Sequence, residues 1–149
     1  MTTAHVIAIY VDERKLKMVE DLRANYVIKA GKGTMRELRR IAAGRLSTVL
    51  DFVGSYDTLR LGYESLRRGG RLVVIGAARG SLTFSSGETR GREVVGSILG
   101  SLSDMNEIIE LAERGKFKVK YSVFDLDEIG TVLEMLKHHE IVGRDVLRP

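Results

Sequence analysis

The sequence contains no cysteine, no tryptophan and only one proline among its 149 residues. Without cysteine, the chain forms no disulfide and offers no thiolate ligand to a metal ion. The apolar run at residues 6–11 is too short for a signal peptide or for a membrane-spanning helix. We therefore expect a cytoplasmic protein that has no membrane partner.

The formal net charge is only +4, because 24 Lys and Arg residues are balanced by 20 Asp and Glu residues. The densest basic segments, at residues 14–17, 39–40 and 67–68, are short and lie apart in the sequence. A surface that binds nucleic acid needs a tighter basic cluster with exposed aromatic side chains. These charges are instead typical of solvated helix faces, and we expect no nucleic-acid partner.

Short apolar runs alternate with helical patterns along the whole chain. Apolar residues make up 44% and charged residues 30% of the sequence, which is typical of a soluble globular domain. The run at residues 71–76 is apolar through its middle, as in a strand that is covered on both faces. The predicted strands lie at residues 6–11, 26–28, 48–53, 71–76, 93–99, 119–124 and 146–147.

Capping residues mark the helices between these strands. Asp12 and Ser103 are predicted N-caps, and Thr34-x-x-Glu37 and Asp125-x-x-Glu128 have the spacing of capping boxes. Inward-facing residues recur at helical spacing, namely Leu59, Tyr63 and Leu66 in one helix and Met105, Ile108, Ile109 and Ala112 in another. This alternation predicts an α/β fold with a mostly parallel sheet and helices on both faces. Ligands of such sheets bind at the carboxyl ends of the strands.

Seven segments resemble, in order and spacing, the medium-chain zinc-type alcohol dehydrogenases, and the archaeal members in particular. These segments are residues 6–16, 22–28, 49–54, 66–76, 95–100, 111–116 and 143–147. The resemblance implies that residues 1–149 form a single, incomplete NAD(P)-binding domain with a truncated Rossmann-like fold. Residues 117–149 would correspond to the segment that packs on the family's catalytic domain. The catalytic domain with its zinc, and the first strand with its glycine-rich loop, have no counterpart in this sequence.

The resemblance also assigns cofactor contacts to loops at the strand ends. Tyr10 and Lys15 correspond to positions at the adenosine ribose, and Val53 and Gly54 to the turn under the adenine. The remaining positions are Ile75, Gly76 and Ala77 at the nicotinamide, Ser97 and Leu99 at its carboxamide, and Arg144 at the pyrophosphate. Ordinary core or surface roles are open for each of these residues.

The cofactor type depends on the end of the first strand. Family members that use NAD place a carboxylate where this chain has Tyr10. Asp12, two residues later, is expected to cap the following helix instead. Loss of the carboxylate removes its repulsion of a 2′-phosphate, so that Arg14 and Lys15 would favour NADP. The sequence leaves both NAD and NADP open.

The chain departs from the family pattern in other places. His138 and His139 have no further ligands at zinc-binding spacing, so we predict no zinc site and no catalytic residue in this chain. Arg23 replaces a helix-ending glycine, at a position that usually has a positive φ. The loop at residues 80–91 is polar, whereas the family's loop is often apolar and packs at the subunit interface.

Two functions fit these features. The chain is either the cofactor-binding portion of an NAD(P)-dependent alcohol dehydrogenase, inactive alone and complemented by a separate chain with the catalytic domain, or a non-catalytic remnant that self-associates. The absent first strand would leave a gap beside residues 6–11 and 48–53. Direct pairing of these two strands, exchange with a second copy or a strand from another polypeptide could fill it. We expect a homodimer through the edge strand at residues 93–99.

Overall fold

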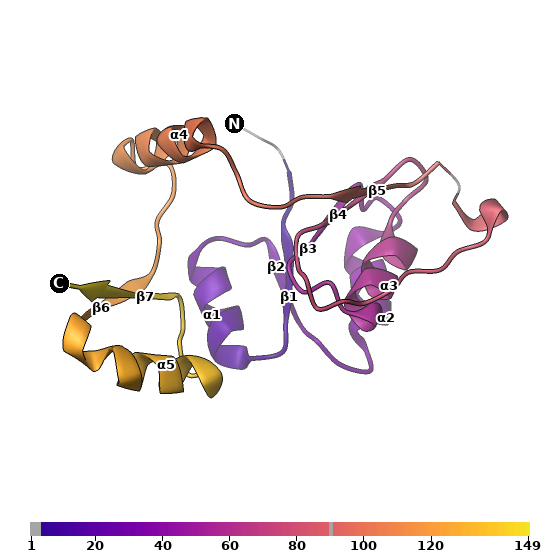
Figure 1. Ribbon diagram of the computed structural model, residues 1–149. Coiled ribbons are helices and arrows are strands. Elements are labelled where there is room, and N and C mark those ends of the chain that lie inside the picture. Colours follow the sequence, from indigo (N-terminus) through magenta and orange to yellow (C-terminus); the bar gives the residue numbers. More distant parts are fainter. Residues whose placement is uncertain (1–3, 90) are drawn as a thin grey trace. The chain divides into compact units, whose positions relative to one another are not determined.

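The computed structural model describes residues 4–89 and 91–149 (Figure 1). The chain divides into two compact units. The first unit contains the N-terminal residues as far as Ala30 and all residues from Ser101 onward, and the second unit contains Gly31–Gly100. No helix within the described ranges is long and apolar enough to span a membrane.

A parallel β–α–β motif begins the first unit. Strand β1 (Ile7–Tyr10) pairs with β2 (Tyr26–Lys29), and helix α1 (Glu13–Asp21) connects them. Asp12 caps α1, as predicted, because its carboxylate accepts a hydrogen bond from the Arg14 amide at 2.8 Å. This cap begins the helix directly after the strand ends.

The C-terminal part of the first unit repeats the parallel pairing. Strand β6 (Tyr121–Asp125) pairs with β7 (Arg144–Arg148). The 3-10 helix η2 (Leu126–Glu128) and helix α5 (Ile129–Lys137) connect these strands, and helix α4 (Leu102–Glu113) precedes them.

Helix α4 differs from its prediction in two respects. Its N-cap is Ser101 and not Ser103, because the Ser101 hydroxyl accepts a hydrogen bond from the Asp104 amide at 3.2 Å. Every residue of α4 is exposed, so the predicted inward face is wrong for Met105, Ile108, Ile109 and Ala112. Their spacing predicts the helix correctly, but no part of the described chain covers this apolar face.

Three parallel strands form the sheet of the second unit. Strand β4 (Arg71–Val74) lies between β3 (Thr48–Asp51) and β5 (Glu93–Gly96). Helix α2 (Thr34–Ala42) precedes β3, and helix α3 (Tyr56–Ser65) connects β3 to β4. Parallel pairing in every sheet that the structure describes confirms the predicted α/β class.

The core of the second unit lies between α3 and the sheet. Leu59, Tyr63 and Leu66 are buried, as predicted, and pack with the fully buried Leu72 of β4. Leu82, from the loop after β4, packs against the same cluster. Helical spacing on α3 therefore identifies the helix face that covers the sheet.

The loop between β4 and β5 contributes to this core although its sequence is polar. The Phe84 ring stacks on Tyr63 with ring centroids 5.3 Å apart. The guanidinium of Arg92 lies 5.2 Å from the same ring, and its Nη2 donates a hydrogen bond to the Leu66 carbonyl at 2.8 Å. Arg90, in the same loop, lies outside the described residues.

Most strands differ by a few residues from their predicted ranges, and the ends of α2 and β5 differ for a visible reason. Helix α2 does not begin with a capping box of Thr34 and Glu37, because Thr34 is itself the first helical residue. Its hydroxyl accepts a hydrogen bond from the Gly31 amide at 2.7 Å instead. Strand β5 ends at Gly96 and not at Leu99, whose φ of 55° is left-handed and incompatible with a strand.

Strand β3 has a free edge, and so does β1. Among the described residues, β1 pairs only with β2, and β3 pairs only with β4 on its one side. Leu50 and Phe52 of the β3 region are 55% and 69% exposed, and a free edge with apolar side chains invites a further strand.

Helix α1 is followed by a residue in the left-handed conformation. Arg23 has a φ of 68°, which confirms the positive φ predicted here. Its amide donates a hydrogen bond to the Glu20 carbonyl at 2.8 Å, so the tight turn is closed despite the side chain. A Cβ atom in this region costs about 1–2 kcal/mol, which a glycine avoids.

We predict that Arg23→Gly stabilises the protein by about 0.5–1 kcal/mol, because relief of this strain exceeds the entropy that glycine adds to the unfolded chain. Urea denaturation measures the free energy of unfolding. Arg45→Gly is the matched control, since Arg45 is exposed and has no positive φ. The control should lose about 0.4–1 kcal/mol. A loss of stability in Arg23→Gly as well would contradict the assignment of strain.

Candidate cofactor site

The turns that follow β3 and β4 lie against each other in the second unit. The Ala78 amide donates a hydrogen bond to the Val53 carbonyl at 3.0 Å, and the Gly80 amide donates one to the Gly54 carbonyl at 2.8 Å. These bonds continue the contact beyond the strands, at the carboxyl end of the sheet. They bring together five residues that the resemblance assigns to the cofactor, namely Val53, Gly54, Ile75, Gly76 and Ala77.

Glycine is required where the two turns approach most closely. Gly54 has a φ of 73°, and a Cβ atom there would lie 2.3 Å from the Gly76 carbonyl oxygen. A Cβ atom on Gly76 would lie 2.1 Å from the carbonyl carbon of Val53. Both distances are far below van der Waals contact. These glycines therefore have a structural role in the packing of backbone on backbone, one of the roles that the sequence left open.

The buried carboxylate of Asp51 holds the turn after β3. Asp51 is 5% exposed, and its Oδ1 accepts hydrogen bonds from the amides of Val53 at 2.8 Å and Gly54 at 3.0 Å. Its Oδ2 accepts a hydrogen bond from the Thr58 hydroxyl at 2.9 Å. Asp51 thus ties the end of β3 to the first turn of α3. We did not predict this role, although an Asp three residues before a glycine and followed by a Ser-x-x-Thr cap was a usable signal.

The two residues assigned to the carboxamide follow β5. The Ser97 amide donates a hydrogen bond to the Val74 carbonyl at 2.9 Å, which holds Ser97 beside β4. Leu99 is 95% exposed and left-handed. The sheet therefore positions Ser97, whereas Leu99 has left it.

In the first unit, Tyr10 and Lys15 lie together at the carboxyl end of β1. The Lys15 Nζ lies 3.4 Å from the Tyr10 Oη and 5.3 Å from the centroid of its ring. Arg14 is engaged differently, because its Nη2 lies 2.7 Å from the Asp12 Oδ2. The two basic residues that were expected to favour NADP therefore have different partners. Arg14 is paired with Asp12, and only Lys15 lies beside Tyr10.

Arg144 begins β7, also in the first unit. Its amide donates a hydrogen bond to the Lys120 carbonyl at 3.0 Å, and its Nη1 donates one to the Gly143 carbonyl at 2.9 Å. The side chain is exposed, and a guanidinium has five N–H donors. Arg144 therefore keeps donors for an anion.

The described residues do not fit a zinc ion. Within residues 4–89 and 91–149, no group of three His, Asp or Glu side chains is placed to hold a metal. His138 is the C-cap of α5, and its Nε2 lies 3.9 Å from a carboxylate oxygen of Glu134. Zinc in proteins is held by at least three protein ligands at about 2.0–2.3 Å. No step of zinc chemistry is therefore assigned to these residues.

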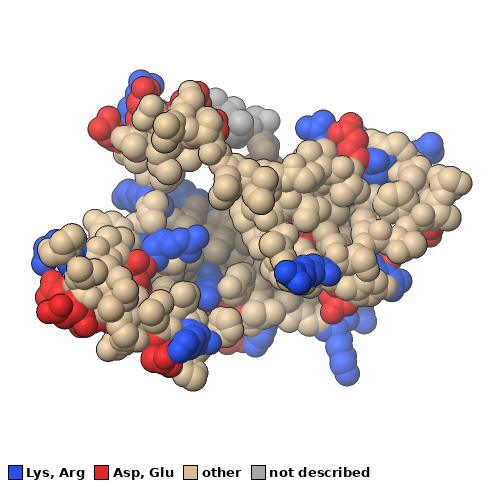
Figure 2. All heavy atoms as spheres, viewed as in Figure 1, with Lys and Arg blue, Asp and Glu red and all other residues tan. Residues whose placement is uncertain are grey.

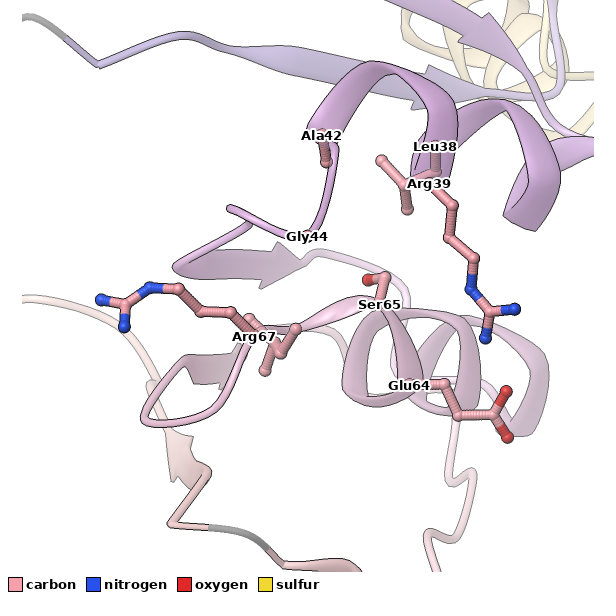
Figure 3. Close-up of a pocket in the computed structure, with 8 residues that line it drawn as sticks. Leu38, Arg39, Ala42, Gly44, Glu64, Ser65 and Arg67 are labelled. Atoms are coloured by element: carbon pink, nitrogen blue, oxygen red, sulfur yellow. The ribbon is translucent and has the colours of Figure 1, made fainter.

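A cavity of about 340 Å³ lies between the C-terminal ends of α2 and α3 (Figure 3). The side chains of Arg39 and Glu64 extend to the same side of this cavity, and that of Arg67 extends to the other side. The Glu64 carboxylate is paired with Arg60 at 2.7 Å. None of the residues assigned to the cofactor lines the cavity, so it is not the predicted site.

Comparison with known proteins identifies relatives that cover nearly the whole chain. The family described as zinc-binding dehydrogenase matches residues 1–114. An NAD-dependent alcohol dehydrogenase of Sulfolobus acidocaldarius is 34% identical over 148 residues, which cover 96% of this chain and 42% of that protein. An alcohol dehydrogenase of Geobacillus stearothermophilus is 30% identical over 97% of this chain and 43% of its own length.

Solved structures of alcohol dehydrogenases are also similar to the whole chain. The crystal structure of the alcohol dehydrogenase from the archaeon Aeropyrum pernix has a TM-score of 0.90 and 37% identity, over 100% of this chain and 44% of that one. This similarity confirms the predicted Rossmann-like fold. The chain spans less than half the length of each of these relatives.

We predict that Gly76→Ala destabilises the protein by about 1–3 kcal/mol, because the added methyl group would overlap the Val53 backbone. Gly96→Ala is the matched control, since no atom lies within 4 Å of a Cβ built on Gly96. Chemical denaturation of both variants isolates the cost at the turn. Equal stability of the two variants would show that the turns do not touch as described.

Proposed function

Because the chain belongs to the zinc-binding dehydrogenase family, we propose that it is the cofactor-binding portion of an NAD(P)-dependent alcohol dehydrogenase. The observation that carries this proposal is the similarity to the Aeropyrum pernix enzyme over the entire chain, at 37% identity. The glycine turns after β3 and β4 support it. The reaction would be hydride transfer between a nicotinamide and an alcohol or carbonyl compound.

The residues of this chain would bind and orient the cofactor. In the second unit, the turns that contain Gly54 and Gly76 lie at the carboxyl ends of parallel strands, where sheets of this class bind ligands. In the first unit, Lys15 offers donors for the adenosine ribose and Arg144 offers donors for a phosphate. The nicotinamide, when bound, supplies the group that exchanges hydride.

A separate polypeptide would supply the zinc chemistry. Among the described residues there is no set of zinc ligands, and a catalytic zinc must therefore be held by other residues. The free edges of β1 and β3 support such a partner, since each carries backbone groups that a further strand would satisfy. We propose that the partner strand pairs there and that the chain alone is inactive.

The second candidate function is that of a non-catalytic remnant that self-associates. Tyr10, in place of a carboxylate, and the strained conformation of Arg23 favour this candidate. The two functions differ in cofactor binding, which calorimetry with NADH and NADPH measures. Measurable binding supports a cofactor-binding portion, because the turns after β3 and β4 would then contact the cofactor. No binding supports the remnant.

We predict that the purified chain does not oxidise primary or secondary alcohols with NAD or NADP, even with added zinc. The reason is that its described residues hold no set of zinc ligands. Absorbance of the reduced cofactor measures turnover, and a heat-inactivated sample is the control. Turnover above that control would contradict the proposed division of the active site between two polypeptides.

The charge distribution supports protein and small-molecule partners over nucleic acid. On the face shown in Figure 2, basic and acidic side chains are interspersed among wide uncharged areas. Binding to nucleic acid depends on concentrated positive charge that neutralises phosphates. We propose a cytoplasmic protein with a cofactor and a protein partner.

The free edge of β5 supports a homodimer. Among the described residues, β5 pairs only with β4, and the exposed fractions of Val94 and Val95 are 46% and 41%. Ile98, just beyond the strand, is 85% exposed. An apolar edge of this kind invites pairing, and pairing with its own copy about a twofold axis closes the assembly at two chains.

We predict a mass of twice 16.6 kDa by light scattering at micromolar concentration. Val95→Lys should shift the mass to that of a single chain, because a buried, unpaired ammonium at the edge opposes pairing. Val119→Lys is the matched control, since Val119 is 56% exposed outside any strand. A mass of 16.6 kDa for the unaltered chain would show that the β5 edge does not associate.

A further inference from the structure

We propose that the Tyr10–Lys15 pair selects a 2′-phosphorylated adenosine, so that the chain prefers NADP to NAD. This inference rests on the proposed function as a cofactor-binding portion and names its cofactor. It differs from the cofactor in the names of the relatives from Sulfolobus acidocaldarius and Sulfurisphaera tokodaii, which are NAD-dependent enzymes. The inference depends on which groups at the end of β1 are already engaged and which are free.

One carboxylate, that of Asp12, lies between the end of β1 and the start of α1. Its oxygens already accept hydrogen bonds. The hydroxyls of an unmodified ribose donate hydrogen bonds, so recognition of NAD needs a free acceptor at this place. Asp12 Oδ1 accepts hydrogen bonds from the Arg14 amide at 2.8 Å and from its Nε at 3.2 Å. Asp12 Oδ2 accepts one from the Arg14 Nη2 at 2.7 Å. Hydrogen bonds from Arg14 lower the pKa of Asp12 to about 2, so the carboxylate is charged and paired at neutral pH.

Two of the three cations around this strand end are engaged. Arg14 is bound to Asp12, and its Nη2 also donates a hydrogen bond to the His139 carbonyl at 3.3 Å. Lys29, at the end of β2, is paired with Glu13. Lys15 takes part in no ion pair within the described part of the chain, and its ammonium contacts Tyr10 instead. Lys15 is therefore the cation that is available to an added anion.

The geometry places two donors side by side. An ammonium has three N–H donors, and donation of one to the Tyr10 hydroxyl leaves two free. The hydroxyl accepts that bond and keeps its own hydrogen for a second acceptor. The ring holds the ammonium above it at 5.3 Å by a cation–π interaction. Among the described residues, the Lys15 ammonium makes its hydrogen bond to Tyr10, so both side chains present further donors to an added ligand.

A phosphate monoester complements this arrangement. It carries a charge close to −2 at neutral pH and three strong acceptor oxygens, so one phosphate can accept from both Lys15 and Tyr10. A ribose diol offers the same pair no charge. The difference of one charge-assisted hydrogen bond corresponds to about tenfold to hundredfold tighter binding of the phosphorylated form.

An NMR titration of the full chain with adenosine 2′,5′-bisphosphate and with 5′-AMP tests the inference. These nucleotides differ only in the 2′-phosphate. We expect the bisphosphate to bind about tenfold to hundredfold more tightly. Lys15→Gln should abolish this preference, and Tyr10→Phe should reduce it. Lys17→Gln is the matched control, because it removes the same charge from an exposed position two residues along α1 and should keep the preference.

The outcomes separate this inference from the proposed function. Equal binding of the two nucleotides, or tighter binding of 5′-AMP, would overturn the preference for NADP and leave the cofactor-binding function in place. A preference that survives Lys15→Gln, or that Lys17→Gln also abolishes, would overturn the assignment to Lys15. The absence of binding of either nucleotide at millimolar concentration would contradict both the inference and the proposed function.

Discussion

The contact between the turns after β3 and β4 is the constraint on which the second unit depends. It forces Gly54 and Gly76 to be glycine, because each side chain position is filled by the other turn's backbone. Asp51 fixes the same turn from within by accepting hydrogen bonds from two backbone amides and from Thr58. This arrangement sets the direction in which α3 leaves the sheet, and hence which of its side chains reach the core at Leu72.

The sequence predicts several local features of the structure, although the caps of α2 and α4 differ from their predictions. Asp12 caps α1, and the spacing of Leu59 and Tyr63 identifies the buried face of α3, because both features arise within a few residues. The apolar face of α4 is exposed, since helical spacing shows that a face is apolar but not what covers it. The stacking of Phe84 on Tyr63 was not predicted, because the two residues lie far apart in the sequence.

The candidate site shows the same limit. The resemblance assigned Val53 and Gly54 to the adenine and Gly76 to the nicotinamide, and it did not predict that the two turns touch each other, as consecutive parallel strands allow. The sequence could not show that Arg14 is paired with Asp12 while Lys15 contacts Tyr10. Both residues are basic and lie at the start of the same helix, so the sequence does not distinguish them. The role of Asp51 was not predicted, although its partners Gly54 and Thr58 lie within seven residues of it in the sequence.

Two turns meet at the carboxyl ends of β3 and β4 in the second unit, and Tyr10 and Lys15 lie together at the end of β1 in the first unit. The unpaired edges of β1 and β3, and the uncovered face of α4, all present apolar surface that suits further protein. A cofactor-binding portion that completes its fold and its active site with another polypeptide accounts for all three. In the proposed function, the zinc ligands would belong to other residues, because the described residues hold no group of three metal ligands.

Backbone amide NMR of the isotope-labelled chain during titration with NADPH tests this account most directly. The account predicts that the amide resonances of Gly54, Gly76 and Ala77 move together as the cofactor is added, while those of Val123 in β6 stay in place. If the resonances at the two turns do not move, or move no more than that of Val123, the turns are structural only and the chain is not a cofactor-binding portion.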